Sequence, residues 1–359
     1  MNAHVSRTSS TDAFASALLA WFDLHGRKDL PWQRERTPYR VWLSEVMLQQ
    51  TQVRTVIPYF ERFVDALPTL AALASAPQDR VLALWSGLGY YSRARNLQRT
   101  AQICIGEHAG DLPRDIEALS ALPGIGRSTA AAILAQAFGE RHAILDGNVR
   151  RVLARWHGVH GWPGGTATQR LLWQYADTHT PGRRVADYTQ AIMDLGATLC
   201  TRSRPHCTRC PVADGCVALR EGLTAALPEA KPRRASPERA TTMLIVRDGS
   251  GRILLERRPP TGVWARLWSL PEVDDTTTAA ARLRDRYAAS CGAPVELGRF
   301  VHTFSHYRLN VMPLLFDGAV RGSRIADDPD HGWYLRAQWS ALGLPAPVRK
   351  LLETLEKTK

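Results

Sequence analysis

Long hydrophobic runs are scarce in this sequence. The one near the start, AFASALLAWF, covers Ala13 to Phe22 and passes directly into Asp23. A helix that crosses a bilayer needs about 20 apolar residues, and the run also fits a signal peptide poorly. We therefore expect no membrane partner and a cytoplasmic, reducing location. The Ser, Thr and Arg content of the first eleven residues leaves an organellar transit peptide as the alternative.

Low-complexity tracts and internal repeats are also lacking. With 45% hydrophobic residues and 11 tryptophans, the chain can bury a substantial core. Its 359 residues are too many for one comfortable core, so we expect at least two domains.

The hydrophobic pattern changes once along the chain. Apolar residues recur at helical spacing from Thr11 to about Leu223. The stretch LPEAKPRRASPERA, rich in Pro and charge, then predicts an exposed linker. Beyond it, two apolar runs flank Asp248-Gly249-Ser250-Gly251 and predict a β-hairpin, while a helical pattern covers Thr277 to Ser290. We therefore predict an α-domain followed by an α+β domain.

Acidic residues are outnumbered, with 34 Asp and Glu against 46 Lys and Arg, which leaves a formal charge of +12. Such a balance favours a polyanionic partner, either nucleic acid or an anionic membrane surface. On charge alone, a merely soluble basic protein is an equally good interpretation.

Cysteine is rare, yet four of the six cysteines lie between Cys200 and Cys216, in the spacing C-x6-C-x2-C-x5-C. Disulfides are improbable in a reducing compartment, so metal ligation by thiolates is the better interpretation. The spacing is compatible with tetrahedral zinc and with a 4Fe-4S cluster. Three arginines, Arg202, Arg204 and Arg209, interleave with the cysteines and suit phosphate contacts.

The segment DIEALSALPGIGRSTAAAILAQAF contains two helical patterns joined by Pro123-Gly124-Ile125-Gly126. Glycines allow a tight turn and a close approach of the backbone, and the second helix begins with free N–H groups at its positive end. We therefore predict that Gly124 and Gly126 grip a DNA phosphate. An ordinary helical turn is the alternative for PGIG taken alone.

Two carboxylates occupy unusual places. On a helix, Glu45 of VWLSEVMLQQT shares its face with Val41, Trp42, Leu48 and Gln49, so burial should raise its pKa and let it act as an acid near neutral pH. The alternative is a structural pair with a core arginine.

Asp146 of ILDGNVRRVLARW follows an apolar run and precedes a helix, where an N-cap is its simplest role. Its position about twenty residues after the hairpin glycines predicts that it lies beside that turn. An acid and a counter-ion are the two carboxylates that glycosidic cleavage through an oxocarbenium-like state requires.

Together these segments resemble a known family. LPGIGRSTA, LDGNVRRVLAR and the cysteine pattern are similar to the helix-hairpin-helix DNA glycosylases that carry a 4Fe-4S cluster. LPWQ, VWLSEVMLQQTQV, GLGYYSRARNL, MDLGATLCTRSRPHC and HTFSHYRL resemble the MutY-type adenine DNA glycosylases, and the match runs from about Phe14 to the C-terminal helix.

The resemblance implies a multidomain fold, with an all-α helix-hairpin-helix glycosylase domain and an iron-sulfur loop followed by an α+β Nudix-like domain. The glycosylase domain covers 1–226, with a six-helix lobe at about 31–144 and an iron-sulfur lobe made from the N-terminal helix and about 145–226. Residues 227–240 are the linker, and 241–359 are the Nudix-like 8-oxoguanine recognition domain.

The implied activity is hydrolysis of the N-glycosidic bond of adenine mispaired with 8-oxoguanine or guanine in double-stranded DNA, by a monomer. Glu45 matches the acid that protonates adenine at N7 and then assists the attacking water, and Asp146 matches the residue that stabilises the oxocarbenium ion. Asn148 and Gln190 match helpers near the sugar and the adenine edge, and Trp32 and Ser128 are assigned to the same pocket.

The remaining assignments concern DNA and the cofactor. Gln50, Thr51, Leu88 and Tyr90 match residues that wedge into the duplex, and Phe304, Ser305 and His306 match the loop that inspects 8-oxoguanine. The ligands of the one 4Fe-4S cluster match Cys200, Cys207, Cys210 and Cys216.

Three departures from the family pattern narrow the function. Bifunctional relatives carry a catalytic Lys where this chain has Ser128, and a Lys that traps the abasic product is replaced by Arg150, which forms a Schiff base poorly. The magnesium-binding glutamates of a Nudix signature fall on Ala289 and Ser290, which predicts recognition without nucleotide hydrolysis. The alternatives are a bifunctional oxidised-pyrimidine glycosylase with lyase activity and a non-catalytic iron-sulfur DNA-binding protein.

Overall fold

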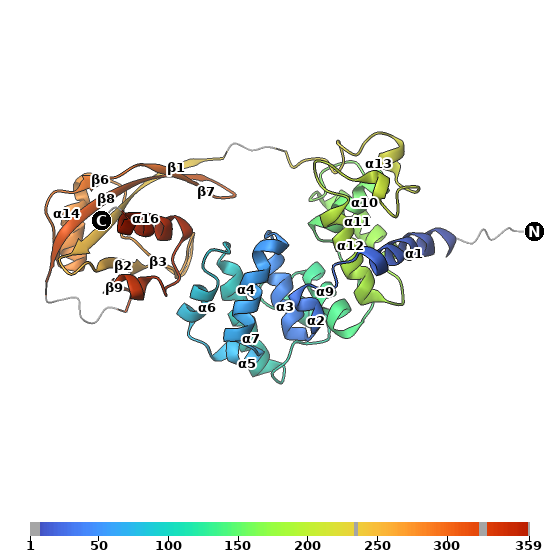
Figure 1. The fold of residues 1–359 in the computed structure, drawn as a ribbon, viewed down its shortest axis with the longest axis horizontal. Helices are drawn as coiled ribbons and strands as arrows, with labels where there is room; N and C mark the ends of the chain where they lie inside the picture. Colours follow the sequence, from blue (N-terminus) through green and yellow to red (C-terminus); the bar gives the residue numbers. More distant parts are fainter. Residues whose placement is uncertain (1–7, 233–235, 323–328, 358–359) are drawn as a thin grey trace, which may run out of the picture. The chain divides into compact units, whose positions relative to one another are not determined.

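The computed structural model describes residues 8–232, 236–322 and 329–357, with side chains from residue 13 onward. The chain divides into two compact units, Met1–Ser75 with Asn96–Arg233, and Ala76–Arg95 with Arg234–Lys359. We call the first the helical unit and the second the mixed unit, and Figure 1 shows the elements of each. The predicted domain borders stay a prediction, and residues 233–235 of the predicted linker lie outside the described residues.

Helices form almost all of the helical unit, as the hydrophobic spacing predicts. Their bounds are α1 (Thr8–His25), α2 (Pro31–Arg34), α3 (Pro38–Leu48), α4 (Val53–Ala66), α5 (Leu70–Ser75), α7 (Ser92–Glu107, from Asn96 onward), α8 (Ile116–Ala121), α9 (Arg127–Phe138), α10 (Gly147–Trp156), α11 (Thr166–His179), α12 (Val185–Thr198), the short η1 (Cys207–Arg209) and α13 (Val217–Arg220). Within the described ranges, none of the helices combines the length and apolar character needed to cross a bilayer.

Local sequence explains where the two helices that carry the predicted carboxylates begin. Before α3, the Thr37 hydroxyl accepts a hydrogen bond from the Arg40 backbone N–H, and Pro38 occupies the first turn. Before α10, the Asp146 carboxylate accepts from the Val149 N–H at 2.8 Å, as the N-cap prediction requires. Both caps fix the start of their helices and so the side chains that follow.

A histidine pair, the buried His179 and the half-buried His157, packs against the core formed by α1, α10, α11 and α12. The Nε2 atoms of His157 and His179 are 2.9 Å apart, and the His157 ring stacks on Tyr175 with centroids 3.5 Å apart. Burial lowers the pKa of both histidines to about 4, and for His157 the neighbouring His179 adds to the effect.

We predict that this pair makes the fold acid-sensitive. Well above pH 6.5 both histidines are neutral whether folded or unfolded. Between pH 6.5 and 4 only the unfolded chain binds the protons, so stability should fall by up to about 3 kcal/mol for His179 and by less for the more exposed His157. Denaturant unfolding of the double variant His157→Phe/His179→Phe should show a smaller loss between neutral and acid pH than the wild type does. The exposed His160→Gln serves as the control, and equal losses in wild type and double variant would contradict the prediction.

The mixed unit is built around one sheet. Its elements are α6 (Gln78–Leu84), β1 (Glu238–Asp248), β2 (Ile253–Arg257), β3 (Trp268–Ser269), β4 (Glu272–Val273), η2 (Thr276–Thr278), α14 (Ala279–Tyr287), β5 (Ala289–Ser290), β6 (Val295–Glu296), β7 (Phe300–Thr303), β8 (Arg308–Arg321), β9 (His331–Tyr334), α15 (Arg336–Trp339) and α16 (Ala346–Lys357). The central strand β1 pairs with β8 in parallel and with β2 antiparallel.

Alternation along β1 separates two apolar layers. Met243 and Ile245 pack with residues of α16, whereas Leu244 and Val246 pack with residues of α14. The predicted hairpin joins β1 to β2, and its turn is held by the Asp248 carboxylate, which accepts from two backbone N–H groups. The predicted helix over Thr277–Ser290 is shorter than expected, because Ala288 takes a left-handed conformation and β5 follows.

Sequence order assigns Ala76–Arg95 to the first domain, but its contacts group it with the mixed unit. Arg257 forms an ion pair with Asp79 at 2.9 Å, and Arg95 donates to the Ala265 carbonyl at 2.8 Å. The Tyr91 hydroxyl donates to the Leu344 carbonyl at 2.9 Å. This segment carries Leu88 and Tyr90, two of the predicted DNA-binding residues.

Candidate active site

A cavity of about 760 Å³ opens in the helical unit between α3, α9, α10 and α12. Eight predicted site residues, from sequence positions 32 to 202, line it: Trp32, Glu45, Thr51, Ser128, Asp146, Asn148, Gln190 and Arg202. The fold therefore brings the two predicted catalytic carboxylates and the whole predicted adenine and sugar pocket to one place.

Glu45 projects from the middle of α3, between the fully buried Ser44 and Val46. The pKa of its carboxyl is raised to about 7. Burial is the largest cause and the negative charge of Asp146 adds to it, while a hydrogen bond from Gln136 acts in the opposite direction. A carboxyl with this pKa holds its proton in a large part of the molecules at neutral pH and can act as a general acid.

Asp146 lies at the start of α10. Burial raises its pKa, while backbone hydrogen bonds from Val149 and Asn148 and the charges of Arg151 and Arg150 act in the opposite direction. Burial is the largest of these influences, so the pKa of Asp146 lies above its ordinary value, and the donors and cations limit that rise. The charge of Asp146 raises the pKa of Glu45 and not the reverse, which makes Glu45 the better candidate for the acid of the pair.

The hairpin and the Asp146 loop are joined by Ser128. Its hydroxyl accepts a hydrogen bond from the Leu145 backbone N–H at 2.9 Å, so the first turn of α9 fixes the residue next to Asp146. Gly124 has a φ of +79°, and a Cβ there would lie 3.0 Å from the Cβ of Asn96, so only glycine fits. The close placement of Asp146 and the hairpin agrees with the sequence prediction.

A second cavity, of about 970 Å³, adjoins the hairpin and shares Ser128, Thr129 and Arg150 with the first. It is lined by the N-terminal residues of α9 and by α11, and its cations are Arg127, Arg150 and Arg170. The Arg127 guanidinium lies over the Trp173 ring at 4.0 Å. A groove with these charges beside a helix N-terminus suits a phosphate backbone.

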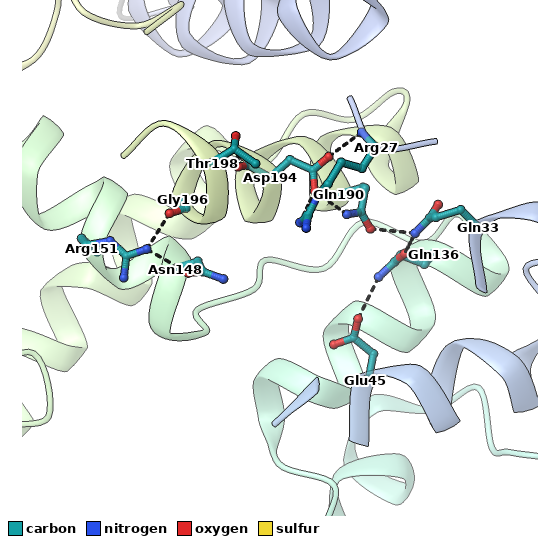
Figure 2. Close-up of polar contacts among 10 residues, drawn as sticks. All are labelled: Arg27, Gln33, Glu45, Gln136, Asn148, Arg151, Gln190, Asp194, Gly196 and Thr198. Atoms are coloured by element: carbon teal, nitrogen blue, oxygen red, sulfur yellow. Dashed lines mark hydrogen bonds and ion pairs between the residues drawn. The ribbon is translucent and has the colours of Figure 1, made fainter. Parts of the chain in front are cut away.

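Four polar residues of the site were missed by the sequence reasoning: the buried Gln33, Gln136 and Asp194, and the half-buried Arg27. Figure 2 shows them joined to Glu45 and Gln190 by an unbroken chain of hydrogen bonds. At its far end, Arg27 binds the fully buried Asp194 through its backbone N–H and its side chain, at 2.6 to 2.9 Å.

Asn148 is held from the other side of the cavity. The Arg151 Nη2 donates to the Asn148 Oδ1 at 2.9 Å and to the Gly196 carbonyl at 2.6 Å (Figure 2). A Cβ at Gly196 would lie 2.6 Å from the Cβ of Asn148, so glycine is needed for α12 to approach α10 this closely. Asn148 is therefore fixed in direction as well as in place.

The four cysteines of the loop line a separate small cavity with Arg155, and all are unpaired thiols. The buried Arg155 donates to the Cys200 Sγ at 3.4 Å and to the Thr201 carbonyl at 2.7 Å. Among the described residues, no three His, Cys, Asp or Glu side chains lie close enough to hold a single metal ion as they stand. Arg202, Arg204 and Arg209 are exposed, as the sequence pattern predicts.

The residues predicted to contact the duplex fall in both units. In the helical unit Gln50 is exposed with a φ of 59° directly after α3, and Thr51 is half-buried. In the mixed unit Tyr90 is 47% exposed with a φ of 48°, whereas Leu88 is buried. Left-handed backbone at non-glycine residues is strained, and such strain is concentrated at functional sites.

Tyr90 also lines a cavity of about 390 Å³ in the mixed unit, together with Phe304, Ser305 and His306. Aromatic side chains dominate it: the Phe304 ring lies 5.1 Å from Trp264 and 4.6 Å from His302. The predicted wedge residue and the predicted lesion-reading loop are thus neighbours in one aromatic cavity.

Comparison with known proteins agrees with this geometry. The sequence profile described as "HhH-GPD superfamily base excision DNA repair protein" matches residues 43–177, and that of the NUDIX domain matches residues 242–354. A solved structure of a thermostable thymine-DNA glycosylase is 27% identical, with a TM-score of 0.54, and covers 59% of this chain and 97% of its own.

Curated relatives match over nearly the whole of this chain. The adenine DNA glycosylase of Buchnera aphidicola is 34% identical over 344 residues, which are 96% of this chain and 98% of the relative. The human adenine DNA glycosylase is 35% identical, over 96% of this chain and 74% of the relative. This chain belongs to the adenine DNA glycosylase family, as its sequence motifs predict.

Proposed function

We propose that this protein hydrolyses the N-glycosidic bond of adenine opposite 8-oxoguanine or guanine in duplex DNA. The observation that carries the proposal is that one cavity is lined by Glu45, with a pKa near 7, and by Asp146, which backbone N–H donors and two arginine charges stabilise as a carboxylate. Glu45 supplies a proton to the departing base and Asp146 stabilises the positive charge that develops on the sugar.

The cavity suits a base that has left the duplex. An adenine inside the helix cannot be reached, and extruding it costs a few kcal/mol, less at a mispair. Trp32 and Leu48 supply apolar lining, and Asn148 and Gln190 supply polar groups for the sugar and the adenine edge. The exposed Gln50 and Tyr90 suit filling of the gap left in the stack.

We propose that the enzyme is monofunctional. Strand cleavage by β-lyase chemistry needs an amine that can form a Schiff base, and the described lining of the cavity includes Arg27, Arg150, Arg151 and other arginines but no lysine. Ser128, at the lyase position, uses its hydroxyl to hold Leu145.

The four cysteines suit one 4Fe-4S cluster, since four unpaired thiols line one cavity beneath a loop organised by Arg155. Cys200, Cys207, Cys210 and Cys216 would hold the cluster through their thiolates, and its iron atoms would cross-link them, so that the loop folds and presents its exposed arginines to the DNA backbone.

We predict that purified protein is yellow-brown and that Cys207→Ala lowers both its iron content and its affinity for DNA by at least tenfold, since structural metal binding contributes directly to folding. Iron analysis, visible absorbance and a DNA-binding titration measure the two effects. Cys104→Ala, at a buried cysteine outside the loop, should retain the iron. A colourless zinc protein from an anaerobic preparation would contradict the cluster.

We propose that the aromatic cavity of the mixed unit recognises 8-oxoguanine, and that Phe304, Ser305 and His306 contact this nucleobase. The Ser305 hydroxyl and the His306 Nδ1 lie 3.4 Å apart, and both side chains are exposed. The sheet carries no Nudix glutamates at positions 289 and 290, so recognition is the better role.

Single-turnover assays test the function directly. Duplexes with adenine opposite 8-oxoguanine, guanine, cytosine or thymine are incubated with enzyme in excess and analysed with and without alkali. We expect adenine release from the first two duplexes and strand breaks only after alkali. No release would contradict the activity, and breaks without alkali would indicate a lyase. In the same assay the double variant Ser305→Ala/His306→Ala should lose preference for 8-oxoguanine over guanine; an unchanged preference would place the lesion reader elsewhere.

A further inference from the structure

Three glutamines connect the proposed acid to the buried Asp194, which forms an ion pair with the half-buried Arg27. The Gln136 Nε2 donates to the Glu45 Oε1 at 3.1 Å, and the Gln33 Nε2 donates to the Gln136 Oε1 at 2.9 Å. The Gln33 Nε2 also donates to the Gln190 Oε1 at 2.6 Å, and the Gln190 Nε2 donates to the Asp194 Oδ1 at 2.7 Å (Figure 2). All three amides are at most 8% exposed.

We call this chain of hydrogen bonds from Glu45 to Asp194 the relay. Asp194 fixes which end of each amide donates and which accepts. An amide can be turned end for end, but a carboxylate paired with Arg27 can only accept, so Gln190 must present its NH2 group to it. Gln190 then offers its oxygen to Gln33, Gln33 offers its NH2 group to Gln136, and Gln136 has only its own NH2 group left for Glu45. The ion pair therefore determines that Glu45 meets a donor.

A donor at Oε1 decides where Glu45 can carry its proton. The Nε2–H of Gln136 already points at Oε1, so the proton of the neutral acid belongs on Oε2. The carboxyl group of Glu45 makes no other hydrogen bond to a described residue. Oε2 is thus the oxygen that remains for a base in the cavity.

Burial of the polar Gln136 side chain costs free energy of folding. Gln136 is 5% exposed near the end of α9, among the buried Ile133, Leu134 and Ala135, where an apolar side chain would suit the core better. The relay also leaves the Gln33 Oε1 buried without a hydrogen bond among the described residues, which is unfavourable for a polar atom. A purely structural role does not explain why amides occupy these positions.

We infer that Gln136 is a positioning residue that orients the carboxyl group of Glu45, and that Asp194 sets the orientation of Gln136 through Gln33 and Gln190. This inference rests on the proposed role of Glu45 as the acid. Gln136, Gln33 and Asp194 act through Glu45 and need not touch the base, whereas Gln190 also lines the cavity.

The test is Gln136→Met, which keeps the length of the side chain but removes the donor. In single-turnover excision of adenine opposite 8-oxoguanine, we expect the plateau rate at low pH to fall about tenfold, since a hydrogen bond to a carboxylate is worth about 1.5 kcal/mol. The donor also stabilises the ionised form of Glu45, so its loss should move the fall in rate at alkaline pH upward by as much as about one pH unit. A variant that lost only stability would not move this limb.

Gln102→Met is the matched control, because the side chain of Gln102 is exposed on α7 and, within the part of the chain that the structure describes, donates to the Ala74 carbonyl alone. Should Gln136→Met fail to fold, Gln33→Met is the second test. It keeps the Gln136 amide that donates to Glu45 but removes the hydrogen bond that Gln136 accepts from Gln33. A slower plateau rate at an unchanged melting temperature supports the relay. Wild-type rate and an unchanged pH profile in the folded variant would overturn the inference while leaving the function intact. Absence of adenine release by the wild type would instead contradict the proposed function.

Discussion

Glu45→Gln should reduce adenine excision by at least about 10²- to 10⁴-fold, the usual contribution of a general acid. Glutamine keeps the size of the side chain and an oxygen that can accept from the Gln136 Nε2, so the relay and the cavity should persist. What it lacks is a proton that can be transferred to the departing base. Affinity for the mispaired duplex and the melting temperature should therefore change little.

The pH dependence of the wild type follows from the same group. Because the pKa of Glu45 is about 7 and the protonated form is the active acid, the single-turnover rate should fall as the pH rises through 7. The residual rate of Glu45→Gln should show no such fall. The control is Glu61→Gln, at an exposed glutamate of α4, which should behave as wild type. A Glu45→Gln enzyme with normal rate would assign the acid to another residue.

Much of this site could be predicted from sequence because its signals are local. Glu45 was found from the apolar residues one turn away on its helix, and Asp146 from its place before a helix. The hairpin glycines follow from the demands of a turn, since Gly124 needs both a left-handed backbone and the absence of a Cβ. Each of these inferences used residues within a few positions of one another.

The relay could not be predicted in that way. Gln136 reaches Glu45 across 91 positions, and Gln33 reaches Gln190 across 157. The one available signal was a glutamine in the otherwise apolar run AAAILAQAF, which by itself says nothing about its partner. Likewise, sequence order could not show that Ala76–Arg95 makes its contacts with the mixed unit, because an ion pair such as Asp79 with Arg257 spans 178 positions.

Asp146→Asn should separate the two roles of Asp146. Asparagine is as good an N-cap as aspartate and can still accept from the Val149 N–H, so α10 should keep its start and the melting temperature should stay close to that of the wild type. The negative charge is lost. Removing one preorganised group that stabilises transition-state charge costs about 10²- to 10³-fold, and we expect a loss of that size in the single-turnover rate.

The pH profile distinguishes this loss from a general disturbance of the cavity. The negative charge of Asp146 contributes to the raised pKa of Glu45, so its removal should lower that pKa and move the alkaline limb of the Asp146→Asn profile to lower pH. Gln136→Met should move the same limb to higher pH, because it removes a group that favours ionised Glu45. Asp146→Ala, which also loses the cap, should cost about 1 kcal/mol of stability in addition. If the alkaline limbs of Asp146→Asn and Gln136→Met moved in the same direction, Glu45 would not be the group that titrates. The assignment of acid and counter-ion would then have to be reversed or abandoned.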